Sequence, residues 1–160
     1  MPHDSARRPF RVRTVYTLTD AEQRRILGAS FRAAARAQPD LAALRERLLA
    51  VGGAEVCIVY YEEDLPQILA RGRADSGRRA LRRPGARSRC HANVARLHEQ
   101  DPGRFRIAAG YALSDDGLWR QHSWGLAADG RPVETPPPRV AYFGFELTSA
   151  EAEAFRDLQD

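Results

Sequence analysis

The sequence predicts an α+β domain with a largely antiparallel sheet, and three observations lead to this prediction. Apolar residues at helical spacing come early, within residues 19–51. One further helix then begins at Ser88 or Cys90 and leads into short segments rich in β-branched and aromatic residues, separated by turn residues. Because helices and strands are segregated along the chain, we expect the N-terminal helices and the central helix to pack on an antiparallel sheet.

The N-terminal third is expected to supply scaffold. Residues 1–10 are polar and are predicted to be disordered, whereas residues 11–17 alternate in polarity like a half-buried strand. A capping-box pattern at Thr19-Asp20-Ala21-Glu22 starts a helix that runs to about Ala37. Asp40 then caps a second helix, which ends at Gly52-Gly53 and presents an apolar face: Leu41, Leu44, Leu48 and Val51.

The middle of the chain contains a buried strand and an arginine-rich segment. Residues 54–61 are predicted to form the strand, in which Cys57 acts as a small hydrophobe, and residues 65–70 a short helix. Residues 71–89 lack apolar periodicity and are predicted to be a long mobile loop. Its arginines are Arg71, Arg73, Arg78, Arg79, Arg82, Arg83, Arg87 and Arg89. The loop could be a solvated linker, or a flap that binds an anionic or carboxylate-bearing substrate.

The last third is predicted to be a strand meander followed by a helix. The helix from Ser88 or Cys90 ends near Asp101-Pro102-Gly103, and Asp116-Gly117 is a strong hairpin signal. The expected strands are residues 105–113, 118–126, 131–135 and 140–146. Thr148 to Glu151 repeats the capping-box pattern and starts a C-terminal helix.

Composition indicates a single globular domain, residues 1–160, of cytoplasmic and bacterial type. The 43% hydrophobic and 29% charged content is that of a soluble protein, and no apolar run reaches the length of a membrane span. The N-terminus lacks the apolar core of a signal peptide, so we expect the two cysteines to stay reduced. The net charge of +4 comes from arginine alone, without lysine, which suggests a GC-rich genome rather than a nucleic-acid partner.

The candidate chemistry lies between Arg89 and Thr135. A cysteine is nucleophilic as the thiolate, and a helix N-terminus supplies the positive potential that lowers a thiol pKa. Cys90 is predicted to occupy such a position, next to Arg89. His122, on a predicted strand, could present one ring nitrogen to Cys90 and the other to Glu134, twelve residues further on. Whether His122 and Glu134 share a face depends on the strand register.

These residues resemble the transglutaminase-like branch of the papain-like superfamily. The motifs are a cysteine at a helix start, the Gly110-Tyr111 strand, His122-Ser123-Trp124, and Glu134-Thr135-Pro136. The resemblance covers residues 89–145, about a third of the chain. It implies that Cys90 is the nucleophile, His122 the base and Glu134 the orienting acid. The sequence has Glu where the family commonly has Asp, and Arg89 where a tryptophan commonly precedes the cysteine.

Four more residues are candidate contacts for the substrate or its oxyanion, and two alternatives to catalysis remain. The four are Gln121, Asn93, Arg89 and Trp124.

A zinc site is the first alternative, and it would use Cys90, His91, His98 and His122. This site is disfavoured because adjacent helix residues point about 100° apart and no C-x-x-C is present, so we expect no metal. A non-catalytic module that uses the arginine segment to bind an acidic partner or nucleic acid is the second alternative.

The sequence therefore predicts a cysteine-dependent amide hydrolase or acyltransferase, of protease, amidase, deamidase or transglutaminase type, that works without a cofactor. The expected partner is a peptide, amide or acyl substrate, anionic substrates included. We expect no membrane partner, and the sequence does not determine the oligomeric state. Hydrolysis and acyl transfer are not distinguished by the sequence.

Overall fold

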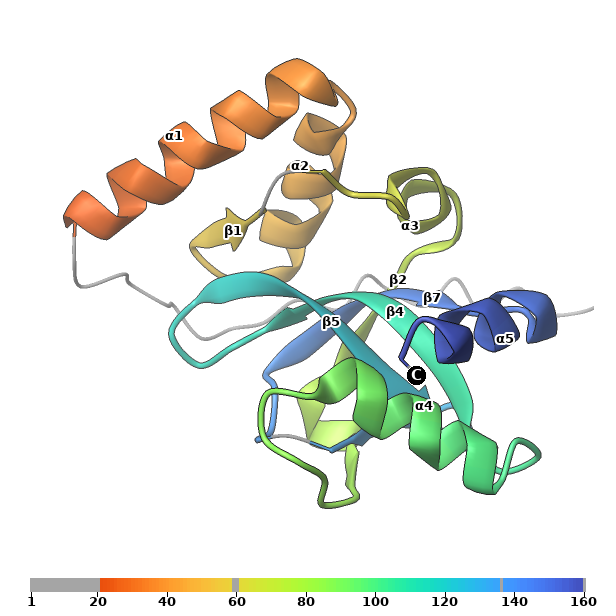
Figure 1. Cartoon of the computed structure of the whole chain (residues 1–160). Helices are drawn as coiled ribbons and strands as arrows, with labels where there is room; N and C mark the ends of the chain where they lie inside the picture. The colour runs from red at the N-terminus through yellow and green to blue at the C-terminus, as the bar shows by residue number, and fades with distance from the viewer. Residues whose placement is uncertain (1–20, 59–60, 136, 160) are drawn as a thin grey trace, which may run out of the picture.

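A computed structural model describes residues 21–58, 61–135 and 137–159. The helices are α1 (Ala21–Ala37), α2 (Leu41–Val51), α3 (Leu65–Arg71), α4 (Cys90–Gln100) and α5 (Ser149–Asp157). The strands are β1 (Glu55–Cys57), β2 (Arg73–Ser76), β3 (Leu81–Arg82), β4 (Arg106–Leu113), β5 (Leu118–Leu126), β6 (Pro132–Glu134) and β7 (Ala141–Glu146). The fold is α+β, as the sequence predicts (Figure 1).

The strands form one curled sheet in the order β2-β7-β4-β5-β6-β3, and β1 pairs with β5 in addition. Pairing is antiparallel except for β1 with β5 and β3 with β6. The predicted hairpin joins β4 to β5, and Gly117 has the positive φ of 84° that its turn requires. β7 lies beside β4 rather than β6, so the predicted meander is wrong for this last strand.

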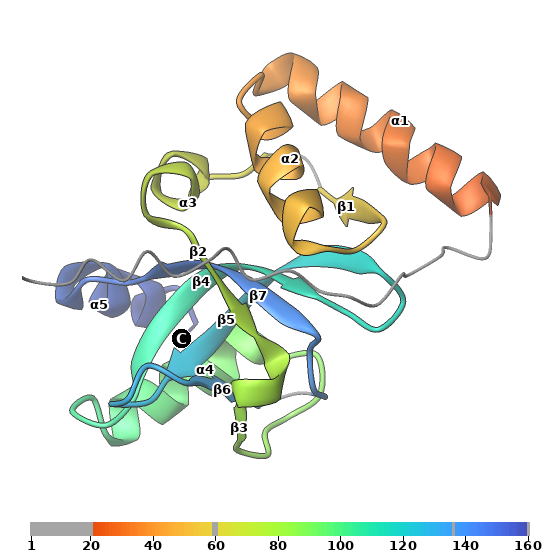
Figure 2. The ribbon, with the colours of Figure 1, turned by 180° about the vertical axis from the view of Figure 1, so that it is seen from behind.

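The helices cover one face of the long β4–β5 hairpin from end to end. α1 and α2 lie over the turn end, where Leu44 and Leu48 of α2 join a core with Leu113 and Trp119 (Figures 1 and 2). α3 packs against β7, away from the turn. α4 and α5 lie over the other end, where Val94 of α4 packs with Ile107 and Ala152. The predicted apolar face of α2 is buried throughout: Leu41, Leu44, Leu48 and Val51. None of the described helices is both long and apolar enough to span a membrane.

The arginine-rich segment is not one loop, and this prediction is wrong for residues 73–82. β2 pairs antiparallel with β7, a 3-10 turn follows at Gly77–Arg79, and β3 pairs in parallel with β6. β2 lies at the edge of the sheet and is held by backbone hydrogen bonds, so its sequence needs no apolar alternation. Residues 83–89, all of them described, form no helix or strand.

The first strands and the helix caps agree with the predictions only in part. Of the strand expected at residues 54–61, Glu55–Cys57 forms a strand and residues 59–60 lie outside the described residues; Cys57 is partly exposed rather than fully buried. Three predictions concern residues outside the described ones: the disorder at residues 1–10, the strand at residues 11–17 and the cap at Thr19. The C-terminal capping box is confirmed, since Thr148 accepts from the Glu151 N–H and Glu151 accepts from the Thr148 N–H.

Candidate active site

Cys90 is the first residue of α4, as the sequence predicts. The chain turns sharply before it: Ser88 has φ of 56°, in the left-handed region that residues other than glycine rarely adopt. No acidic residue lies in the first turn of α4, and Arg89 provides no side-chain cap. The thiol therefore lies at the positive end of an uncompensated helix dipole.

The thiol of Cys90 also lies at a break in the edge of β5. β4 pairs with one edge of β5 along its length, so β1 and β6 must share the other edge. β1 pairs with residues 118–120 and β6 with residues 125–126, which leaves residues 121–124 for the N-terminus of α4. There the Cys90 sulfur accepts hydrogen bonds from the N–H groups of Ser123 and His91.

His122 is buried, with a side chain 3% exposed, and interacts with both other members of the predicted triad. Its Nε2 lies 2.9 Å and 3.1 Å from the two carboxylate oxygens of Glu134. The thiol of Cys90 hydrogen-bonds the same ring, and Nδ1 is the nitrogen left for it. The arrangement suits a base that faces the nucleophile with one nitrogen and its orienting acid with the other.

The register of β5 and β6 places Glu134 on the His122 face of the sheet. Gly125 pairs with Val133 and Leu126 with Pro132, which puts Glu134 opposite Trp124 and diagonal to His122. The Glu134 carboxylate, 1% exposed, also accepts hydrogen bonds from the Tyr142 hydroxyl at 2.8 Å and from the Thr135 N–H at 3.1 Å. A buried carboxylate with this many donors is held in one position.

The electrostatics favour a thiolate and an imidazolium. Burial alone would raise the pKa of the Cys90 thiol, but the hydrogen bond and charge of His122 and the two backbone N–H groups bring it below its ordinary value. Burial alone would lower the pKa of His122, but hydrogen bonds with Cys90 and Glu134 raise it. The two shifts are opposite in sign and favour transfer of the thiol proton to the ring.

The other two described histidines have separate contacts. His91 Nδ1 lies 2.7 Å from the Ser123 hydroxyl, and its ring meets Phe155 edge-on. His98 Nδ1 donates to the Phe105 carbonyl at 2.6 Å. Among the described residues no group of His, Cys, Asp or Glu side chains is arranged to hold a metal ion.

Trp124 and Gln121 lie on opposite faces of β5, because side chains alternate along a strand. Trp124 stacks against His122, with ring centroids 6.1 Å apart, and is 4% exposed, so it supports the imidazole ring. Gln121 donates instead to the buried carboxylate of Glu62, at 3.3 Å. The structure thus places the Gln121 amide on the face away from His122, where the oxyanion role expected for it has no geometric support.

Asn93 and Arg89 flank the turn that leads into α4. The Asn93 amide accepts from the Ala86 N–H at 3.1 Å and donates to the Ala86 carbonyl at 2.7 Å, so it holds the preceding segment against the helix. A contact between Asn93 and the substrate stays a prediction. Arg89 precedes Cys90 directly and is exposed.

Sequence reasoning missed Tyr142 and Ser123. Tyr142 comes from β7, which reaches the site because β7 crosses to the far side of β4. No local pattern marks a tyrosine as the partner of a carboxylate three strands away. Ser123 lies inside the His-x-Trp motif. Its place next to His122 could have indicated that the Ser123 N–H faces the Cys90 thiol.

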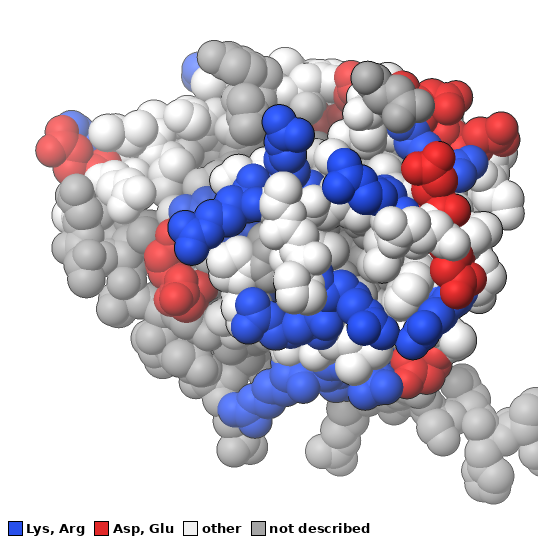
Figure 3. Space-filling view, turned by 60° about the horizontal axis from the view of Figure 1, so that its bottom comes forward, with Lys and Arg blue, Asp and Glu red and all other residues white. Residues whose placement is uncertain are grey.

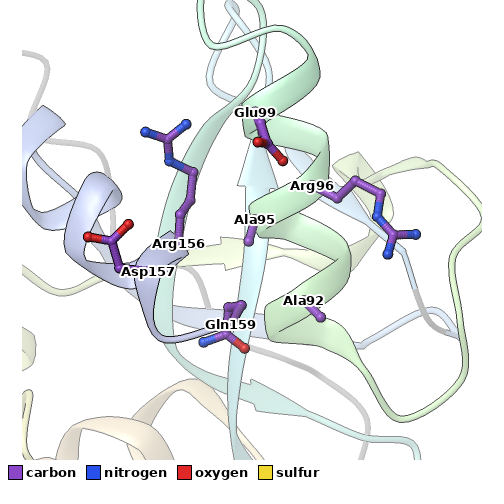
Figure 4. A pocket seen from close by; sticks show the side chains of 7 residues that line it. All are labelled: Ala92, Ala95, Arg96, Glu99, Arg156, Asp157 and Gln159. Carbon is purple, nitrogen blue, oxygen red and sulfur yellow. The ribbon is translucent and has the colours of Figure 1, made fainter.

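Two cavities adjoin the site without containing the triad. The larger, of about 830 Å³, has Trp124, Ala108 and Gly144 on its sheet side, with charged side chains such as Arg73 around it. The smaller, of about 240 Å³, lies between α4 and α5, where Ala92 and Ala95 face Arg156 (Figure 4). Trp124 links the larger cavity to the back of the His122 ring.

Comparisons with protein-family models, with curated proteins and with solved structures found no match to this chain.

Proposed function

We propose that this protein is a cysteine-dependent amide hydrolase or acyltransferase that forms an acyl-enzyme on Cys90. The observation that carries the proposal is the chain of hydrogen bonds from the partly buried Cys90 through the buried His122 to the buried Glu134. A nucleophile, a base and an orienter in contact are the requirement for covalent acyl chemistry. The proposed thiol chemistry fits a reducing compartment such as the cytoplasm.

In the first step the Cys90 thiolate attacks the carbonyl carbon of an amide, and the carbonyl electron pair moves to the oxygen. The tetrahedral intermediate then collapses and the C–N bond breaks. The His122 imidazolium gives its proton to the departing amine nitrogen, and a thioester remains on Cys90.

In the second step neutral His122 takes a proton from the acceptor that attacks the thioester. If the acceptor is water, the product is a carboxylic acid; if it is an amine, the product is a new amide. The C–S bond breaks, and the thiolate and imidazolium are restored. Glu134 keeps Nε2 protonated and the ring in position throughout.

A generic acyl donor tests the proposal without knowledge of the natural substrate. Incubation with p-nitrophenyl acetate should release a burst of p-nitrophenolate and add one acetyl group to Cys90, detectable by mass spectrometry of the tryptic peptides. Cys90→Ser and His122→Ala should lose the burst, whereas Cys57→Ser should keep it. Equal acetylation of Cys57 and Cys90, or a burst that survives in Cys90→Ser, would reject the site.

A further inference from the structure

The chain around Cys90 carries positive charge with no nearby negative charge in sequence. Residues 81–97 contain five arginines and no aspartate or glutamate. All five are exposed, and we call them the arginine rim: Arg82, Arg83, Arg87, Arg89 and Arg96. Arginine side chains gather on the side of the molecule that lies at the bottom of Figure 1, where α4 is drawn (Figures 1 and 3).

The arginine rim has no internal carboxylate, unlike seven other arginines of the described chain. Seven arginines outside it form ion pairs: Arg25, Arg45, Arg71, Arg79, Arg106, Arg120 and Arg131. Within the rim, Arg83 lies over the Phe105 ring at 5.8 Å. The other four have no carboxylate partner among the described residues. Their guanidinium groups are free to bind an external anion.

The segment that carries the arginine rim is held at both ends of the candidate site. At one end the Arg83 N–H donates to the Glu134 carbonyl at 2.9 Å, and β3 pairs with β6. At the other end the two hydrogen bonds between Asn93 and Ala86 fix the segment to α4. The backbone is therefore positioned between Glu134 and Cys90 rather than free to swing away.

The helix extends the same strip of charge past the thiol. Arg89, Asn93 and Arg96 are spaced four and three residues apart, so they share one face of the start of α4. Asn93 contacts the segment at Ala86. The side where the segment meets the helix therefore carries Arg87, Arg89 and Arg96. A ligand bound along this strip would pass beside Cys90.

We infer that the arginine rim binds acidic polypeptide, so that the acyl or amide group attacked by Cys90 is flanked by aspartate or glutamate side chains. Guanidinium groups bind carboxylates with paired, charge-assisted hydrogen bonds. A polypeptide offers both the carboxylates and the carbonyl, whereas a nucleic acid lacks the acyl carbon on which the site would act. This inference rests on the proposed function for the link to catalysis, but binding itself can be measured without catalysis.

The test measures binding of a fluorescein-labelled oligoglutamate peptide to the full-length Cys90→Ser protein by fluorescence anisotropy. Replacing Arg82, Arg87 and Arg89 with Gln should weaken binding by about tenfold, since exposed ion pairs are individually weak. The matched control replaces Arg25, Arg32 and Arg36 of α1 with Gln and should leave binding unchanged. Arg96→Glu is a second, independent variant on the helix surface, and it should weaken binding severalfold.

A competition assay connects binding to the thiol and does not depend on turnover. In the wild-type protein, unlabelled oligoglutamate should slow alkylation of Cys90 by iodoacetamide, and added salt should remove this protection. The inference is overturned if oligoglutamate does not bind, or if the α1 control weakens binding as much as the rim variant. It is also overturned if single-stranded DNA binds tighter and oligoglutamate leaves the alkylation rate unchanged. Loss of the acetylation burst with intact peptide binding would reject the proposed function alone.

Discussion

The Glu134 carboxylate and the His122 imidazole meet across two adjacent strands, with Nε2 2.9 Å from the nearer carboxylate oxygen. Both side chains are almost fully buried, so the pair is shielded from water. This contact orients the ring so that its other nitrogen serves Cys90. The reactivity of Cys90 should therefore depend on this pair and on the residues that hold it.

Glu134→Gln should preserve the shape of the side chain while removing the charge that stabilises the imidazolium. We expect acylation of Cys90 by p-nitrophenyl acetate at neutral pH to slow by about 10²–10⁴-fold. Stopped-flow measurement of p-nitrophenolate release provides the rate. Wild-type acylation in this variant would remove Glu134 from the mechanism.

Tyr142→Phe removes a hydroxyl that donates to Glu134, and Tyr111→Phe is its matched control. Both tyrosines are buried and donate to a carboxylate, Tyr111 to Glu62 at 2.5 Å. Each substitution should lower the free energy of unfolding by about 1–3 kcal/mol, measured by urea denaturation. Only Tyr142→Phe should slow Cys90 acylation; if both variants slow it equally, Tyr142 acts through stability rather than through the triad.

The rate of alkylation by iodoacetamide should depend on pH differently at the two cysteines. His122 and the two backbone N–H groups lower the pKa of Cys90 below 9.0, so its thiolate persists at pH values where an ordinary thiol is protonated. Burial raises the pKa of Cys57 above 9.0, so it should react only in more alkaline solution. Measurement in Cys57→Ser and Cys90→Ser backgrounds separates the two profiles. Identical profiles would argue against an activated Cys90.

Asn93→Ala should loosen the segment that precedes Cys90. The two hydrogen bonds with Ala86 are lost, which should cost about 1–2 kcal/mol and speed tryptic cleavage after Arg87. Gly85→Ala should act similarly, because a Cβ there would lie 2.7 Å from the Asn93 amide. In the double variant the truncated side chain at position 93 leaves room for the methyl group added at position 85, so the two effects should be less than additive. Simple additivity would show that the two positions do not act through one contact.

Glu62→Gln should stabilise the protein at neutral pH. Burial raises the pKa of Glu62 above its ordinary 4.5, although the Tyr111 hydroxyl and two N–H donors oppose the shift. A raised pKa in the folded state means stability that is present at low pH and is lost as the pH rises through that pKa. The melting temperature of Glu62→Gln should therefore exceed that of wild type at pH 7.5 and match it near pH 4. Exposed Glu63→Gln should change neither value.

Local sequence determined most of the elements and the position of the nucleophile. The apolar spacing of α2, the Asp116-Gly117 turn and the capping box at Thr148 depend on residues near one another in the chain, so the sequence predicts them directly. The start of α4 at Cys90 and the strand that carries His122 follow from the same kind of pattern.

Tertiary structure decided which of these residues meet. The register of β5 against β6 puts Glu134 on the His122 face, and a shift by one residue would have pointed it away. The crossing of β7 to the far side of β4 brings Tyr142 to the same carboxylate, and the alternation of β5 turns Gln121 toward Glu62 instead. Register and strand order are set by burial and backbone pairing between distant segments, which no local pattern of residues records.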